Sequence, residues 1–324
     1  MAVIETGKRT APTRRHPSLT RGRQPGMTAR ARLAPYLLIA PTAAVLLAVQ
    51  GWPLVKMVML SLQNLTQRNL FTGTTPEWYG LRNYTTIFAD PFFWKVVGRT
   101  VAFTVVNVVL TIVLATGLAL LMRRASGWCR KLITFTLICV WAMPTLVSTL
   151  IFNWMTDFSF GVANWLLSRI PGVDFIHHNW FANPLQGFAV ITAIVVWGAL
   201  PFVAITLYAG LTQVPRELEE AARVDGASPA QVFRNVTYPV LRPLYVIVTT
   251  LSVIWDFQVF NQVWVARYGK PEPQYFTLGI YSFTKSFGVN EYSLGSAIAV
   301  VTVAMLVVFT FFYLRQGLRM GEFE

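Results

Sequence analysis

Two groups of residues in this chain of 324 amino acids have types and spacing that could do chemistry. The first is the polar stretch from Glu220 to Ala227, which lies between two long apolar runs. Its small residues Ala221 and Ala222 would let one side of a helix approach another surface closely. Phe233 would add an apolar anchor on an otherwise polar loop. Two interpretations are open: a docking site for another protein, or a stable helical hairpin without a partner.

The second group lies in the apolar segment that follows. One face of this segment carries polar and aromatic residues at helical spacing, with an amide at its margin: Ser252, Trp255, Asp256, Val259, Gln262 and, at the margin, Gln258. Polar groups that face lipid are costly, so this face should point into a helix bundle. There it would either hydrogen-bond to other helices or line a pathway with an aromatic plate and hydroxyl partners for a sugar.

Three further residues are candidates for the same pathway. Asn261 lies in the same segment, and Trp197 and Phe202 flank Pro201 in an earlier apolar run. For the two aromatic residues, ordinary helix packing is the alternative interpretation. The candidate pathway therefore consists of Trp255, Asp256, Gln258, Asn261, Trp197 and Phe202.

The composition indicates that lipid is the main solvent of this chain. Hydrophobic residues make up 54% and charged residues 13%, whereas soluble domains carry about 25% charged residues. The net charge of +13 is concentrated in the N-terminal tail and the short loops, which favours membrane orientation over nucleic-acid binding. The two cysteines and three histidines lack the spacing of a disulfide framework or a metal site.

Six apolar runs are long enough to cross a bilayer, which takes about 20 residues. They cover residues 33–55, 100–122, 132–156, 186–211, 244–266 and 292–314. Prolines in three of them predict kinks that face the bundle interior. The sequence therefore predicts an all-α, polytopic membrane helix bundle with one domain over residues 33–324. Residues 1–32 are basic and predict a disordered cytoplasmic tail, with Met27 as an alternative start.

The basic residues also predict the orientation of the bundle. The tail is basic, the loop after the second run carries Arg123, Arg124, Arg130 and Lys131 without an acid, and Arg315 follows the last run. Because cytoplasmic loops are enriched in Lys and Arg, both termini should face the cytoplasm. An even number of spans agrees with this, and it places the loop 212–243 inside the cell.

Within the loop 212–243, local signals predict two short helices joined by a tight turn. Pro215 suits the first position of the first helix. Asp225-Gly226 should end that helix, because glycine readily adopts a positive φ. The residues Ser228 to Gln231 have the form of a capping box. Pro239 should stop the second helix.

The loop resembles the EAA loop of ABC-transporter permease subunits, which sits in a cleft of a separate ATP-hydrolysing subunit and transmits its closure. The resemblance implies that Glu220 makes an ionic contact and that Gly226 forms the turn that sets the docking angle. The coupling positions that it implies are Glu220, Ala221, Ala222, Asp225, Gly226, Ala227, Phe233 and Pro239.

Two other stretches resemble the first permease subunit of carbohydrate importers of the maltose and glycerol-phosphate types. They are the segment from Gly80 to Trp94, with its Asp90-Pro91 pair, and the segment from Trp255 to Asn261. The resemblance implies a type I ABC importer permease fold. It also implies a second permease in a heterodimer, two ATP-binding subunits that hold ATP and Mg, and an extracytoplasmic solute-binding protein. No cofactor or metal is expected on this chain.

The substrate expected from the sequence is a neutral mono- or oligosaccharide, because no lysine or arginine lies in the middle of a span to pair with a phosphate. Glycerol 3-phosphate or another polar solute is the alternative. The chain lacks a P-loop, so ATP hydrolysis would belong to another subunit. A membrane enzyme or a channel is a more distant alternative, because no cluster of acids and histidines and no filter-like run is present.

Overall fold

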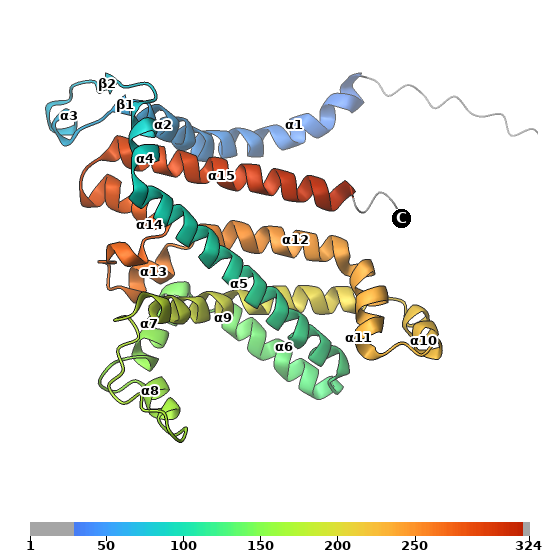
Figure 1. Ribbon diagram of the computed structural model, residues 1–324. Helices are drawn as coiled ribbons and strands as arrows, with labels where there is room; N and C mark the ends of the chain where they lie inside the picture. The colour runs from blue at the N-terminus through green and yellow to red at the C-terminus, as the bar shows by residue number, and fades with distance from the viewer. Residues whose placement is uncertain (1–28, 320–324) are drawn as a thin grey trace, which may run out of the picture. The chain divides into compact units, whose positions relative to one another are not determined.

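The computed structural model describes residues 29–319, with side chains from residue 38 to residue 315. It separates into two compact units, Met1–Pro53 and Leu54–Glu324 (Figure 1). The predicted disordered tail lies outside the described residues as far as residue 28. In the first unit, helix α1 (Ala29–Leu46) begins within the last residues assigned to that tail and continues through a π-helical turn, η1 (Leu47–Gly51).

The described part of the second unit is mostly helical, which confirms the predicted fold class. Its long helices are α5 (Pro91–Arg124), α6 (Gly127–Trp141), α7 (Thr145–Met155), α9 (Pro184–Leu211), α12 (Tyr238–Phe257) and α15 (Tyr292–Arg319). The short elements are the end of α2 (Trp52–Ser61), α3 (Gln67–Thr72), α4 (Arg82–Ala89), α8 (Val162–Leu167), α10 (Arg216–Val224), α11 (Pro229–Val232), η2 (Phe233–Thr237), α13 (Asn261–Ala266), η3 (Pro273–Tyr275), α14 (Leu278–Phe283) and η4 (Thr284–Gly288). Strands β1 (Gln63–Asn64) and β2 (Glu77–Trp78) pair antiparallel.

Five helices among the described residues are long and apolar enough to cross a membrane, and the bent pair α6–α7 makes a sixth if it counts as one span. The second predicted span is part of the longer helix α5. The Asp90 side chain accepts a hydrogen bond from the Phe92 backbone N–H at 2.8 Å, and Pro91 occupies the first turn. This N-cap starts the helix nine residues before the predicted boundary at residue 100.

The third predicted span is not one kinked helix, so that prediction is wrong. Helices α6 and α7 meet at an angle of 98° on either side of Pro144. Pro144 has an extended backbone as the N-cap of α7. A proline has no N–H to donate and disfavours a helical residue before it, so the chain turns here. In contrast, Pro201 stays inside α9.

The prediction that a helix stops at Pro239 is also wrong. Helix α12 begins at Tyr238 and carries Pro239 in its first turn, directly after the π-helical turn η2. Proline is tolerated in a first turn because its missing N–H is not needed there. The fifth predicted span instead breaks at residues 258–260, between α12 and α13.

The core of the second unit lies where α5 packs along α9 and α12 (Figure 1). One buried cluster joins the N-terminal half of α5 to α9, α14 and α15, with Phe93, Ile191 and Ile298 as members. The other joins the C-terminal half of α5 to α9 and α12, and there Thr116 and Tyr245 share a hydrogen bond of 2.9 Å. This second cluster holds in place the helix ends between which α10, α11 and η2 are inserted.

Candidate docking hairpin and polar cavity

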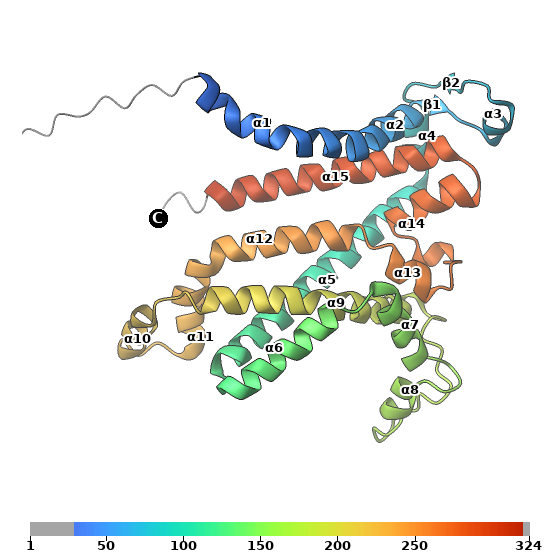
Figure 2. The ribbon, with the colours of Figure 1, turned by 180° about the vertical axis from the view of Figure 1, so that it is seen from behind.

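The docking hairpin, residues 212–237, connects α9 to α12, and its helices α10 and α11 lie together beyond the ends of both (Figure 2). Pro215 is the N-cap of α10, one position before the predicted one. Gly226 has φ +86°, and its N–H donates to the Arg223 carbonyl at 3.0 Å, while the Ala227 N–H donates to the Ala222 carbonyl at 3.0 Å. These two bonds form a Schellman motif, which confirms the predicted glycine turn.

The predicted capping box is confirmed as well. The Ser228 N–H donates to Oε1 of Gln231 at 2.7 Å, and the Gln231 N–H donates to Oγ of Ser228 at 3.4 Å. The turn and the start of the second helix are therefore built by bonds among neighbouring residues.

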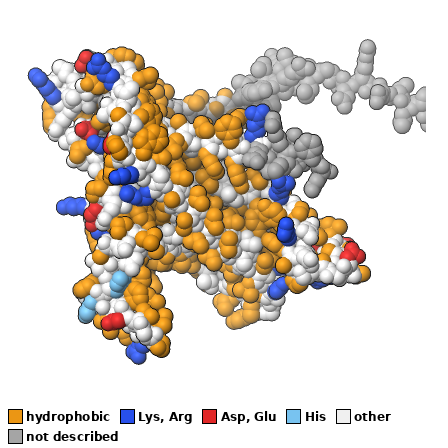
Figure 3. Space-filling model, viewed as in Figure 1, with side chains coloured by type: hydrophobic (Ala, Val, Ile, Leu, Met, Phe, Trp, Pro, Cys, Tyr) orange, Lys and Arg blue, Asp and Glu red, His pale blue; other side chains and the backbone are white. Residues whose placement is uncertain are grey.

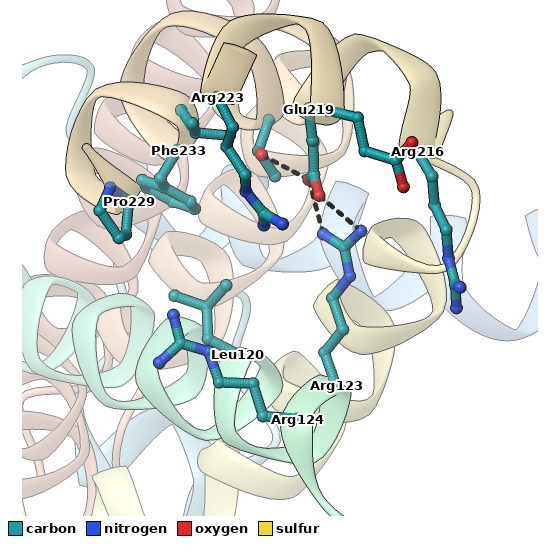
Figure 4. A pocket seen from close by; sticks show the side chains of 11 residues that line it. Leu120, Arg123, Arg124, Arg216, Glu219, Arg223, Pro229 and Phe233 are labelled. Carbon is teal, nitrogen blue, oxygen red and sulfur yellow. Dashed lines mark hydrogen bonds and ion pairs between the residues drawn. The ribbon is translucent and has the colours of Figure 1, made fainter. Parts of the chain in front are cut away.

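A buried ion pair ties the hairpin to the end of α5 (Figure 4). Nη1 and Nη2 of Arg123 donate to Oε1 and Oε2 of Glu219 at 2.7 and 2.9 Å. The Thr237 hydroxyl donates to Oε1 of the same carboxylate at 2.9 Å. Glu219 is only 6% exposed. Because the contact is bidentate, it sets both the position and the tilt of α10 relative to α5.

The predicted coupling residues of α10 are more exposed than Glu219. Glu220 and Ala221 are exposed, and Ala222 is half-buried. Val224 is 88% exposed, although it is a large apolar residue. The exposed surface of α10 therefore presents a carboxylate beside small and apolar side chains, as is expected of a surface that another protein covers. Its coupling role stays a prediction.

The remaining predicted coupling residues occupy the turn and the second half of the hairpin. Asp225 and Gly226 are exposed, Ala227 is half-buried, and Phe233 is half-buried with its ring 6.5 Å from that of Tyr238. Pro239 lies in the first turn of α12, directly after the hairpin. It therefore lies where the hairpin joins α12 and does not end a helix.

Sequence reasoning missed the anchor, Arg123 and Glu219. In the sequence, Arg123 indicates only the orientation in the membrane, and the family resemblance points to Glu220 and not to its neighbour Glu219. One signal was available, because Glu219 and Ala222 are three residues apart and share a helix face. A small residue such as Ala222 is consistent with a helix face that packs inward. Glu219, on the same face, is then expected to point inward too.

The hairpin should lose stability in acid through Glu219. Burial alone would raise the pKa of Glu219, but hydrogen bonds from Arg123 and Thr237, together with the charge of Arg123, hold the pKa below its ordinary value of 4.5. A lowered folded-state pKa adds stability that is complete above that ordinary value and is lost as the pH falls through the folded pKa. We expect hydrogen exchange in residues 216–224 to rise as the pH falls below the ordinary value of 4.5. A Glu219→Gln variant should lack this acid transition, and an identical transition in that variant would contradict the assignment.

Beside the anchor, a cleft of about 310 Å³ opens between α5 and the hairpin (Figure 4). Four of its lining residues are arginines, and two are glutamates: Arg123, Arg124, Arg216, Arg223, Glu219 and Glu220. The cleft is therefore positively charged, and among its lining residues that the structure describes only Arg123 and Glu219 form a direct ion pair.

The candidate pathway residues are only partly brought together. A separate cavity of about 220 Å³ is lined by Trp197, Trp255 and Asp256, together with Val259 and Gln262. Phe202 does not line the cavity, but its ring packs edge-on against Trp255 at 5.3 Å.

Gln258 and Asn261 are exposed and lie outside the lining of this cavity. The prediction placed them on one continuous helix, whereas the helix ends at Phe257 and restarts at Asn261. The break changes the direction of the side chains that follow it.

Two polar atoms of the expected face are buried without a hydrogen-bond partner among the described residues. They are Oδ2 of Asp256 and Oγ of Ser252. Buried polar atoms are nearly always paired, with protein or with bound molecules. Asp256 lines the cavity, so this carboxylate can accept a hydrogen bond from a molecule that enters it. Among the described residues no group of three His, Cys, Asp or Glu side chains could hold a metal ion.

Comparison with known proteins gives a consistent result. The family model described as "Binding-protein-dependent transport system inner membrane component" matches residues 111–320. The diacetylchitobiose uptake system permease protein DasB of Streptomyces coelicolor is 40% identical over 292 residues, which is 90% of this chain and 89% of DasB. The trehalose/maltose transport system permease protein MalF of Thermococcus litoralis is 32% identical over 283 residues, 87% of this chain and 92% of its own.

A solved structure shares the fold. In the crystal structure of a bacterial ABC transporter involved in the import of the acidic polysaccharide alginate, one chain aligns with a TM-score of 0.75 at 17% identity. The alignment covers 90% of this chain and 97% of that one.

Proposed function

Because the chain belongs to the family of binding-protein-dependent transport system inner membrane components, we propose that it is the permease subunit of an ATP-driven importer of a neutral carbohydrate. The relatives DasB and MalF, named for diacetylchitobiose and for trehalose and maltose, support the substrate class. The transport subunit itself is not an enzyme in this proposal. ATP and Mg are held by two ATP-binding subunits, and a second permease and an extracytoplasmic solute-binding protein complete the assembly.

The observation that carries the proposal is the docking hairpin. Its exposed side chains include Glu220, Ala221 and Val224, while the buried Glu219 is bound to α5 by Arg123. A displacement of α10 by a docked ATPase subunit would therefore be passed to α5 through a bidentate contact. This contact supports a mechanism in which nucleotide-dependent closure of the ATPase subunits, outside the bundle, moves helices within it.

The charges along α5 support an orientation with both termini in the cytoplasm. Arg123 and Arg124 end the helix near the hairpin, and no charged residue lies between them and Arg99. Cytoplasmic ends of membrane helices are enriched in Arg and Lys. On the face in Figure 3, Lys and Arg gather at the two ends of the view, and hydrophobic side chains cover most of the surface between them. The hairpin end is the cytoplasmic one in this proposal.

The cavity around Asp256 supports a neutral sugar over a phosphate ester. Trp197 and Trp255 offer apolar ring faces, and the orphaned carboxylate oxygen of Asp256 offers an acceptor for sugar hydroxyls. No lysine or arginine lines this cavity. A phosphate ester that entered this cavity would therefore find no cationic side chain to pair with. Glycerol 3-phosphate therefore remains the less favoured alternative.

The test is transport by the whole assembly in proteoliposomes. The chain is purified with its partner subunits and solute-binding protein, and ATP hydrolysis is measured with neutral disaccharides and with glycerol 3-phosphate. We expect stimulation by a neutral saccharide, and a weakened uptake when Asp256→Asn alters the cavity. Stimulation by glycerol 3-phosphate alone would overturn the substrate class, and a complex without an ATPase subunit would overturn the importer itself.

A further inference from the structure

An open groove of about 990 Å³ runs along the outside of α5 and α9, and it is separate from the cavity around Asp256. Its walls are almost wholly apolar. Helix α5 contributes Val106, Leu110 and Leu114, and α9 contributes Phe188, Ala189 and Ala193. The two alanines are exposed, so the groove is deep where their side chains are short. An apolar groove of this kind on a membrane helix pair excludes water and accepts hydrocarbon.

The groove has one charged residue, Arg99, and it lies at one end. Arg99 and Pro184 mark that end on the two helices, and Leu114 and Leu200 mark the other. From Arg99 to Leu114 the groove follows α5 for about 22 Å at 1.5 Å per residue. One leaflet contributes about half of a hydrocarbon core that is about 30 Å thick. The groove is therefore long enough for the acyl chain of a lipid in one leaflet.

Arg99 lies at the depth of the lipid headgroups. The stretch from Arg99 to Arg123 contains no other charged residue and measures about 36 Å along the helix, slightly more than a hydrocarbon core of about 30 Å. The two arginines therefore lie near opposite boundaries of the core. Trp94, which is 54% exposed, precedes Arg99 on the same helix, as expected for a residue of the interfacial belt.

Hydrogen bonds hold the guanidinium of Arg99 in place, but they do not use all of its N–H donors. Nη1 donates to the carbonyl oxygens of Pro273 and Phe276 at 2.9 and 3.0 Å. Within the described residues, Nε and Nη2 have no acceptor, and no carboxylate pairs with this cation. The side chain is thus fixed at the mouth of an apolar groove. Its Nε and Nη2 donors and its positive charge are available for a ligand. A phosphate oxygen fits both properties.

We propose that this groove is a binding site for a phospholipid, whose phosphate accepts hydrogen bonds from Arg99 and whose acyl chain lies between α5 and α9. The lipid would come from the leaflet opposite the docking hairpin. Its binding does not depend on the identity of the transported solute, since it rests only on the membrane placement of α5. By filling the space beside Phe103 and Phe188, whose rings lie 5.3 Å apart, a bound chain would support the α5–α9 contact at which the core is built.

Photolabelling of the complete, purified transporter tests this site. The probe is a phosphatidylglycerol that carries a diazirine in its acyl chain, and the readout is the set of labelled peptides, together with retained phospholipid in native mass spectrometry. We expect label to concentrate in residues 102–114 and 188–200. Arg99→Gln should reduce it about tenfold, as for loss of a charge-assisted hydrogen bond. Lys95→Gln removes a nearby exposed cation from the same helix and should leave labelling unchanged.

A second variant separates loss of binding from local damage. Ala193→Trp fills the groove but leaves Arg99 and its carbonyl partners in place, so it should reduce the labelling as strongly as Arg99→Gln. Equal labelling of this variant and the natural chain would overturn the proposal, as would label spread evenly over all membrane helices. A helix of the second permease in the groove, seen in a structure of the assembly, would overturn it too. None of these three results would affect the transport assignment, which the uptake measurement tests separately.

Discussion

Arg123→Gln is expected to destabilise the docking hairpin by about 3 kcal/mol and to reduce coupled uptake more than tenfold. The variant leaves the Glu219 carboxylate buried, with the Thr237 hydroxyl as the one remaining hydrogen-bond donor in the described part of the chain. Removing one partner of a buried pair costs about 3 to 5 kcal/mol, mostly through the charge left behind. The lower value applies because the Arg123 side chain is 24% exposed. Uptake in proteoliposomes and hydrogen exchange in residues 216–224 measure the two effects.

Two variants serve as controls for the anchor. Arg124→Gln removes the adjacent arginine, which has no ion pair among the described residues, and it should leave exchange in α10 near the natural rate. Arg123→Gln combined with Glu219→Gln removes both charges and should recover part of the stability, because no carboxylate then stays buried without a cation. Natural exchange rates in Arg123→Gln alone would show that the pair does not hold the hairpin.

Gly226→Val is expected to separate ATP hydrolysis from transport. Gly226 has φ +86° at the C-terminus of α10, and a Cβ built there meets no other atom within 4 Å. The cost is therefore one of backbone conformation: a residue other than glycine pays about 1 to 2 kcal/mol in the left-handed region, and a β-branched one is a genuine outlier there. The strained turn should tilt α10, so that ATPase activity persists while stimulated uptake falls severalfold.

The matched control at this position is Gly226→Asn. Asparagine enters the left-handed region more readily than other residues with a side chain, so this variant should retain most of the uptake. ATPase activity and uptake are measured side by side in the reconstituted complex. If Gly226→Val retains full substrate-stimulated hydrolysis and uptake, the angle of the turn has no part in coupling.

Much of the hairpin could be predicted because its bonds are local. The capping box joins Ser228 to Gln231, and the Schellman motif joins Ala222 to Ala227. Such bonds link residues three to five positions apart, so residue types and spacing are enough to predict them. The same holds for the membrane helices, whose apolar length is a property of one segment.

The failures lie where a local signal has more than one outcome. Pro144 divides a span, Pro201 remains inside a helix and Pro239 begins one. Proline removes one donor and restricts its neighbour in every case. Whether the chain then bends or continues depends on which neighbouring helices pack against it, which no single segment specifies.

By itself the sequence determined the helical class, the apolar spans, the glycine turn and the family to which the chain belongs, because each depends on composition or on residues close together in the chain. Only the tertiary structure decided that Glu219 is buried against Arg123, 96 positions away, while Glu220 stays exposed. It alone decided that Asp256 lines a cavity and Asn261 does not. Contacts between distant segments form when helices pack, and the energy of packing is shared among many residues at once.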